Sequence, residues 1–164
     1  MPGGFPHRRR SHLPDPHTCR TRTPPCTPST RWRPAGYDLL LVPGGTITAD
    51  TLRLREAAVH TVLAFTVAGR PVAFTVDGRP VAAICHGPWL PAEAGVAYGK
   101  RLTSYPSVRT DLANAGATWT DEPLVTDDAD GWRLVTSRNP DDLEHFLRGV
   151  DAALRTRSEA VGSR

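Results

Sequence analysis

The chain has 164 residues, the length of a single domain, and a formal net charge of +3. No apolar run approaches the roughly 20 residues of a membrane-spanning helix, and the basic N-terminal stretch lacks the apolar centre of a secretory signal. Three widely spaced cysteines, an odd number, argue against a disulfide framework. We therefore expect a protein of a reducing, cytoplasmic setting with no membrane partner.

Residues 1–36 differ in composition from the rest of the chain. They contain seven arginines, one acidic residue and eight prolines, which gives this segment a charge of +6 against −3 for the remainder. Because such a segment buries too little apolar surface to offset its ordering entropy, we predict a disordered Arg/Pro-rich tail.

Two functional interpretations of this tail are weak. Arg8–Arg10 would suit nucleic acid or anionic lipid. His12, His17, Cys19 and Cys26 would suit a metal, but their spacing fits no common zinc pattern. We therefore expect no nucleic acid partner, no metal and no other cofactor.

The first predicted strand of the domain is Tyr37–Val42, whose apolar residues indicate burial. Pro43–Gly45 ends it, and glycines at this place let backbone N–H groups face a ligand or an oxyanion. An ordinary turn at the end of a strand has the same composition. A helix is predicted over Thr51–Val67, with Asp50 as its N-cap and His60 as a surface or packing residue.

A nine-residue segment is repeated in tandem over residues 64–81. Ala64–Val72 and Ala73–Val81 agree at eight of nine positions. The period is too short and the copies are too few for a solenoid. Either the extra residues loop out, or Val72–Val76 forms a strand that turns at Asp77-Gly78 into the next one. We favour the loop or a partial hairpin, and the sequence leaves both open.

The stretch Arg79–Leu90 contains the main candidate for chemistry. Val81–Ile84 is small and apolar with no alternation, which favours a strand covered on both faces. Cys85 and His86 follow, and then a Gly-Pro pair that suits a close turn and the start of a helix. A thiol at the start of a helix lies near free N–H groups, whose partial positive charge favours the thiolate.

Cys85 can therefore act as a nucleophile, with His86 as the adjacent proton acceptor. A buried structural thiol is the alternative interpretation. Because neighbouring residues of an extended strand point to opposite faces, the pair can cooperate only if the backbone bends between them.

The remaining segments alternate between helix and strand. In chain order we expect a helix over 88–94, a strand over 101–104, a helix over 107–115, strands over 118–120, 124–126 and 132–137, and a helix over 140–155 before a polar tail over 156–164. On the last helix, Leu143, Phe146, Leu147, Val150 and Leu154 are expected to face inward. Residues 127–131 lack the spacing of a calcium loop and indicate a solvated acidic turn. The alternation predicts a parallel-sheet α/β sandwich, flavodoxin-like in form.

Several motifs resemble one known family. Ala83–Pro88 is similar to the nucleophile elbow of the PfpI-type intracellular protease/amidase family, part of the class I glutamine amidotransferase-like superfamily. Tyr37–Gly45, Leu102–Ser107, Asn114–Ala117 and Leu134–Leu143 resemble further motifs of that family in the expected order. The resemblance covers Tyr37 to about Leu154, so the α/β domain is expected over 37–155.

The resemblance implies that part of the fold is missing. Members of the family begin with a strand-helix-strand unit, whose first loop supplies a glutamate that bonds the cysteine. Residues 1–36 resemble no such unit and contain no Glu. We therefore expect an N-terminally truncated fold with an exposed strand edge, and one hypothesis is that residues 1–36 are not the natural start.

The resemblance also implies a site. Cys85 would be the nucleophile, His86 would assist proton transfer, and the N–H groups of Gly45 and His86 would hold an oxyanion. The expected substrate contacts are Gly44, Gly87 and Trp89. In the family an acidic residue of a neighbouring subunit approaches the histidine; Asp50 is the nearest match, although an N-cap role is the safer interpretation.

Two classes of function follow from the resemblance. The first is a cysteine-dependent hydrolase, a peptidase/amidase or a protein deglycase, which acts on a small-molecule or peptide substrate as a dimer or hexamer of this chain. The second is a non-catalytic stress-response or chaperone-like member of the family, or an inactive truncated remnant. The intact elbow favours the first, and the missing glutamate favours the second.

Overall fold

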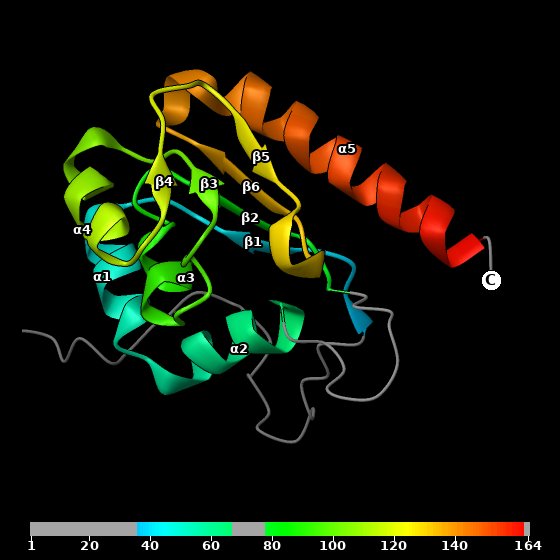
Figure 1. Ribbon diagram of the computed structural model, residues 1–164, viewed down its shortest axis with the longest axis horizontal. Coiled ribbons are helices and arrows are strands. Elements are labelled where there is room, and N and C mark those ends of the chain that lie inside the picture. The colour runs from blue at the N-terminus through cyan, green and yellow to red at the C-terminus, as the bar shows by residue number, and fades with distance from the viewer. Residues whose placement is uncertain (1–35, 67–77, 163–164) are drawn as a thin grey trace, which may run out of the picture. The chain divides into compact units, whose positions relative to one another are not determined.

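The computed structural model describes residues 36–66 and 78–162 (Figure 1). Its main sheet has four strands in the order β1-β2-β6-β5, and a second, two-stranded sheet is formed by β3 and β4. The strands are β1 Leu40–Val42, β2 Val81–Ile84, β3 Arg101–Leu102, β4 Thr118–Trp119, β5 Val125–Asp127 and β6 Leu134–Ser137. β1, β2 and β6 run parallel, whereas β5 runs antiparallel to β6.

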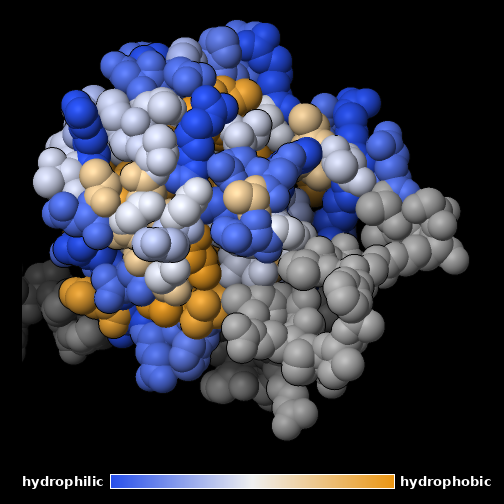
Figure 2. Space-filling model, viewed as in Figure 1, coloured by the Kyte–Doolittle hydropathy of each residue, from blue (hydrophilic) through white to orange (hydrophobic). Residues whose placement is uncertain are grey.

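Helices cover the two faces of the main sheet. They are α1 Thr46–Arg53, α2 Glu56–Thr66, α3 Trp89–Glu93, α4 Arg109–Asn114 and α5 Leu143–Gly162, with short 3₁₀ turns η2 Pro106–Val108, η3 Ala129–Gly131 and η4 Pro140–Asp142. Figure 1 shows α5 along one side of the sheet and α1, α2 and α3 on the other. On the face in Figure 2, hydrophobic residues gather where Figure 1 places these three helices, and most of the remaining surface is hydrophilic.

β2 is the centre of the core because it has a parallel neighbour on each side. Its alternate residues enter two separate apolar clusters. Val81 and Ala83 pack with Phe65 of α2, whereas Ala82 packs with Phe146 of α5. Small apolar residues at successive positions are what a strand between two helical layers requires, so the predicted strand buried on both faces is confirmed.

The α/β architecture is confirmed, but the sheet is mixed and not wholly parallel. β5 returns through η3 directly into β6, and a short connection of this kind joins antiparallel strands. The predicted buried strand Tyr37–Val42 is partly wrong. It is shortened to β1, and Tyr37 and Leu41 are 54% and 47% exposed because β1 lies at the edge of the described sheet.

The predicted helix Thr51–Val67 is replaced by two helices. α1 begins at Thr46 directly after Gly45 and ends at Arg53, and α2 begins at Glu56. Asp50 therefore lies inside α1, and its predicted role as an N-cap is wrong. Its carboxylate instead accepts a hydrogen bond from Arg53 one turn later. His60, predicted as a surface or packing residue, is a surface residue.

The predicted polar tail after residue 155 is also wrong over its first part, because α5 continues to Gly162. Ion pairs support this extension, with Arg155 bonding Asp151 and Arg157 bonding Asp38 near β1. On α5, Phe146 is buried and Val150 is packed against its cluster. The predicted inward-facing residues that are instead 39–52% exposed are Leu143, Leu147 and Leu154.

Some predictions concern residues outside the described ranges. The tail over 1–36, with its candidate basic and metal-binding residues, lies almost wholly outside the described residues. The alternative conformations of the repeat concern residues 67–77, which also lie outside them.

Candidate active site

The chain bends sharply where β2 ends. Cys85 has a φ of 63°, a left-handed conformation that costs a non-glycine residue free energy. Its N–H donates to the carbonyl of Ser137 at 3.0 Å, and its own carbonyl accepts from Tyr105 N–H at 2.9 Å. The bend that cooperation between Cys85 and His86 requires is therefore present and is held by hydrogen bonds from two other segments.

This bend places the thiol and the imidazole side by side. Cys85 Sγ lies 3.1 Å from Nδ1 of His86. The imidazole is buried, with 7% of the residue exposed, and burial lowers the pKa of His86 below its ordinary value of 6.5. At neutral pH the ring is therefore uncharged and can accept a proton from the thiol.

Four side chains from three segments surround the ring of His86. The Tyr105 ring stacks on it at 5.0 Å between centroids, and the Trp89 ring meets it edge-on at 5.3 Å. Nε2 lies 3.3 Å from Thr46 Oγ1 at the start of α1 and 3.3 Å from Ser107 Oγ in η2. The ring therefore has an aromatic neighbour on one face, a second aromatic neighbour in an edge contact, and a polar contact at each nitrogen.

Two glycines let the backbone approach the cysteine closely. A Cβ at Gly44 would lie 2.8 Å from Cys85 Cβ, and a Cβ at Gly87 would lie 2.9 Å from the carbonyl oxygen of Val42. Atoms at these distances would force the backbone to move. The two predicted substrate-contacting glycines therefore have a structural reason of their own for lacking a side chain.

Asp50 lies in a second layer around the site. It pairs with Arg53, whose guanidinium stacks on the Trp89 ring at 4.8 Å. The indole N–H of Trp89 donates to Asp111 of α4 at 2.8 Å. A surface cavity of about 220 Å³ is lined by Arg53, Trp89 and Asp111, among others. Within this chain, Asp50 reaches His86 only through Arg53 and Trp89.

The structure adds three residues that sequence reasoning gave no role. Tyr105 and Ser107 lie in Leu102–Ser107, one of the motifs that resemble the family. Nothing in that motif indicates that the two residues contact His86. Thr46 follows the glycines and looks like the first residue of an ordinary helix. In the folded protein, the start of α1 lies beside the elbow, and the Thr46 hydroxyl is therefore a neighbour of His86 Nε2.

The opposite end of the sheet has a different character. Lys100 has no exposed surface, and its ammonium donates to the carbonyls of Ala129 and Trp132 and lies 3.3 Å from Asp127 Oδ1. Burial lowers the pKa of Lys100 despite this carboxylate. Burial opposes ionisation of Asp127, but the N–H groups of Arg101 and Ala129 and the Lys100 ammonium together outweigh it and hold the pKa of Asp127 below its ordinary value.

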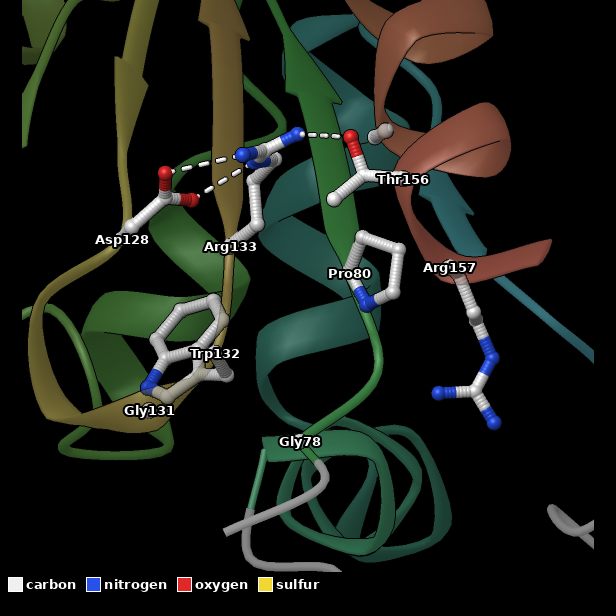
Figure 3. A pocket seen from close by; sticks show the side chains of 9 residues that line it. Gly78, Pro80, Asp128, Gly131, Trp132, Arg133, Thr156 and Arg157 are labelled. Carbon is white, nitrogen blue, oxygen red and sulfur yellow. Dashed lines mark hydrogen bonds and ion pairs between the residues drawn. The ribbon is translucent and has the colours of Figure 1, made fainter. Parts of the chain in front are cut away.

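The same turn carries a second ion pair beside a pocket. Both oxygens of Asp128 accept from Arg133, at 2.6 and 2.9 Å, and Arg133 also donates to Thr156 of α5 (Figure 3). These residues and Trp132 line a pocket of about 270 Å³ at the end of β2 and β6 away from Cys85. The predicted solvated acidic turn is therefore wrong in part, because two of its carboxylates are paired with cations.

The described residues bring together no three His, Cys, Asp or Glu side chains that could hold a metal ion. None of their helices has both the length and the apolar character needed to cross a membrane.

Comparison with known proteins identifies the class to which this fold and site belong. The model of the DJ-1/PfpI family matches residues 26–152. The chain is 40% identical over 115 residues to deglycase PfpI of Pyrococcus furiosus, a match that covers 70% of this chain and 61% of that protein. It is 42% identical over 112 residues to general stress protein 18 of Bacillus subtilis, covering 68% and 58%.

A solved structure agrees with this. The fold resembles a two-domain protein from Anabaena variabilis with DJ-1/ThiJ/PfpI-like and ferritin-like domains, with a TM-score of 0.65, 32% identity, and coverage of 76% of this chain and 32% of that one. The chain belongs to the DJ-1/PfpI family, which confirms the resemblance and the flavodoxin-like fold class. It spans about three fifths of the length of the curated relatives it matches.

Proposed function

We propose that the protein is a cysteine-dependent hydrolase of the peptidase/amidase or deglycase type, with Cys85 as its nucleophile. The observation that carries the proposal is the left-handed bend that sets Cys85 Sγ 3.1 Å from Nδ1 of a buried, uncharged His86. Nucleophile and base within hydrogen-bond reach, with the base held by further groups, is the arrangement that nucleophilic catalysis needs. The names of relatives as deglycases support the same chemistry.

The reaction begins with the transfer of the thiol proton to His86. The sulfur attacks the carbonyl carbon of the substrate, and a C–S bond forms as the carbonyl oxygen becomes an oxyanion. For an amide substrate, the C–N bond then breaks while His86 returns its proton to the leaving amine. Water hydrolyses the resulting thioester, releases the acid and restores the thiol.

The oxyanion would be held by the backbone N–H groups of Gly45 and His86. Neither donates to a backbone carbonyl among the described residues, so both are available to a ligand. Gly44 and Gly87 allow the close packing around the thiol, and Trp89 lines the neighbouring cavity. These support the predicted roles of the glycines and of Trp89 at the substrate. The proposal includes a small-molecule or peptide substrate, a cytoplasmic location and assembly of several copies.

A second candidate, a non-catalytic stress-response protein, is favoured by a different observation. A relative that is 42% identical to the chain over 112 residues is named as a general stress protein. Under this second candidate, the Cys85 thiol would be reactive but the protein would not turn over a substrate.

Deglycation of a glyoxal-modified peptide, measured as recovery of the free amine, tests the proposal. The wild-type chain is compared with Cys85→Ala, and Tyr98→Ala, which alters an exposed side chain away from the elbow, serves as the control. We expect turnover that is lost in Cys85→Ala and retained in the control. Equal rates for wild type and Cys85→Ala would remove the catalytic claim and leave the non-catalytic candidate.

A further inference from the structure

The second nitrogen of the catalytic histidine has partners of an unexpected kind. Nε2 of His86 lies 3.3 Å from each of two hydroxyl oxygens, Thr46 Oγ1 and Ser107 Oγ. Within the described residues of this chain, no carboxylate pairs with the ring. Asp50, which the resemblance relates to the histidine of a neighbouring subunit, is bonded to Arg53 in its own chain. What these hydroxyls do decides which ring nitrogen carries the proton.

A neutral imidazole has one protonated nitrogen and one acceptor nitrogen, and the partner of the first fixes the second. If a hydroxyl donated to Nε2, the proton would reside on Nδ1, which faces Cys85 Sγ at 3.1 Å. The ring could not then take the thiol proton. If the hydroxyls accept from Nε2–H, Nδ1 is free to act as the base.

The surroundings favour the accepting role. Thr46 and Ser107 are both exposed residues, so each hydroxyl can donate its own proton to solvent while its oxygen faces Nε2. His86 itself is 7% exposed, and its Nε2–H would otherwise lack an acceptor. Two oxygens at equal distance can share one N–H, and a buried N–H without a partner costs free energy.

We propose that Thr46 and Ser107 are positioning residues whose hydroxyls accept from Nε2–H of His86 and so keep Nδ1 unprotonated toward the Cys85 thiol. The inference rests on the proposed function, because it concerns the base of that reaction. It also differs from a carboxylate-oriented histidine. A hydroxyl fixes the tautomer but stabilises an imidazolium less than a carboxylate does.

The other groups around the ring are consistent with this assignment. The titratable neighbours are Cys85 and the stacked Tyr105. Of the charged side chains on the packed elements, Asp50 pairs with Arg53 on α1, Asp111 accepts from Trp89, and Arg109 lies over the ring of Trp119 at 5.2 Å. Glu93 of α3 lines the neighbouring cavity, and no bond joins it to His86. Among the described residues of this chain, the two hydroxyls are therefore the groups within bonding distance of Nε2.

The test uses the full chain and two double variants. Thr46→Val/Ser107→Ala removes both acceptors, whereas Thr46→Ser/Ser107→Thr keeps both hydroxyls with similar changes in bulk. Alkylation of Cys85 by iodoacetamide is followed by mass spectrometry between pH 5 and 9, with Cys19 and Cys26 as reference thiols. We expect alkylation at pH 7 to be about tenfold slower in the first variant, as for the loss of one or two hydrogen bonds. The second variant should remain within about twofold of wild type.

The tautomer is read directly from the ¹⁵N shifts of histidine-labelled protein, with His86 assigned by its absence in His86→Gln. We expect the Nε2–H form in wild type and a mixture in Thr46→Val/Ser107→Ala. A carboxylate in the same place, Ser107→Asp, should instead move the alkylation profile to lower pH because it stabilises the imidazolium.

The outcomes separate the inference from the proposed function. If wild-type Cys85 reacts no faster than it does in urea, the proposed function fails. The inference alone is overturned if wild-type Cys85 is selectively reactive but the alkylation rate of Thr46→Val/Ser107→Ala equals that of wild type. It is also overturned if alkylation slows equally in the two double variants. If Thr46→Val/Ser107→Ala does not fold, the tautomer of His86 in the wild-type protein tests the inference. The Nδ1–H form would contradict it.

Discussion

The two ends of the parallel strands are held in different ways. At the end where β2 terminates in Cys85, the polar contacts of His86 are 3.1–3.3 Å long, involve no ionised partner and surround a left-handed residue. At the other end, Asp128 and Arg133 bond at 2.6 and 2.9 Å, and Lys100 is enclosed with three acceptors. Short, charged bonds hold one end, whereas longer contacts to a thiol and two hydroxyls hold His86 at the other.

This difference indicates a division of roles. Charge-assisted hydrogen bonds are about twice as strong as neutral ones, so the turn around η3 anchors β5 and β6. A nucleophile and base need a proton that can move, and strong ionic partners would fix it. The strain at Cys85 is tolerated because hydrogen bonds from Ser137 and Tyr105 hold the backbone on both sides of it.

The largest effect is expected from breaking the anchored end. Lys100→Met removes the cation and leaves Asp127, which is largely buried, beside Asp128 and Asp130. Removing one partner of a buried pair costs about 3–5 kcal/mol of unfolding free energy. Urea denaturation measures the loss, and the surviving folded fraction should still alkylate Cys85 at the wild-type rate.

The matched control lies one residue away. Arg101 pairs with Glu122 at 3.5 Å, and both side chains are about half exposed. Arg101→Met should therefore cost at most about 1 kcal/mol, because exposed ion pairs contribute little. Equal losses for the two variants would contradict the proposed anchoring by Lys100.

A smaller effect is expected from relieving the strain at the reactive end. Cys85→Ala retains the left-handed conformation, whereas Cys85→Gly relieves a cost of about 1–2 kcal/mol. Glycine also lowers the stability by about 0.5–1 kcal/mol, because it raises the conformational entropy of the unfolded chain. We expect Cys85→Gly to be more stable than Cys85→Ala by roughly 1 kcal/mol in urea denaturation.

The sign of the stability difference between Cys85→Gly and Cys85→Ala distinguishes a strained position from an ordinary one. At Ala113, inside the short helix α4, the same Ala-to-Gly exchange should destabilise by about 0.5–1 kcal/mol. If Cys85→Gly is instead the less stable of the two variants at position 85, the bend is not a strained one.

The features predictable from the sequence are those with a local pattern. The apolar run Val81–Ile84 and the Cys-His-Gly-Pro turn located β2, the elbow and the start of α3, and the contact between Cys85 and His86 followed from them. The fold class followed from alternating patterns and from motif order.

What the sequence could not reveal depends on contacts between distant segments. Thr46 and Ser107 meet His86 across 40 and 21 residues, and no local spacing encodes that. No local pattern marks Lys100 as buried, because its partners lie 27–32 residues later in the chain. Asp50 was assigned as a cap because the break between α1 and α2 has no Gly or Pro to mark it.

The smallest effect concerns acid, and it tests whether the histidine at the reactive end is uncharged. Burial holds the pKa of His86 below 6.5, so the unfolded chain binds a proton there more readily than the folded protein. Stability is therefore full above about pH 6.5 and falls as the pH is lowered through the folded pKa. Asp127 and Asp142 have lowered pKa values and add a separate loss only below about pH 4.

Urea midpoints between pH 5 and 8 separate these windows. We expect wild type to lose stability between pH 7 and 5, and His86→Gln to lose less because its amide does not titrate. His60→Gln is the matched control, because it makes the same exchange at a histidine whose side chain is 65% exposed. If His60→Gln flattens the slope and His86→Gln does not, the uncharged base at Cys85 is wrong. The contrast between the two ends of the sheet would then lose its chemical basis.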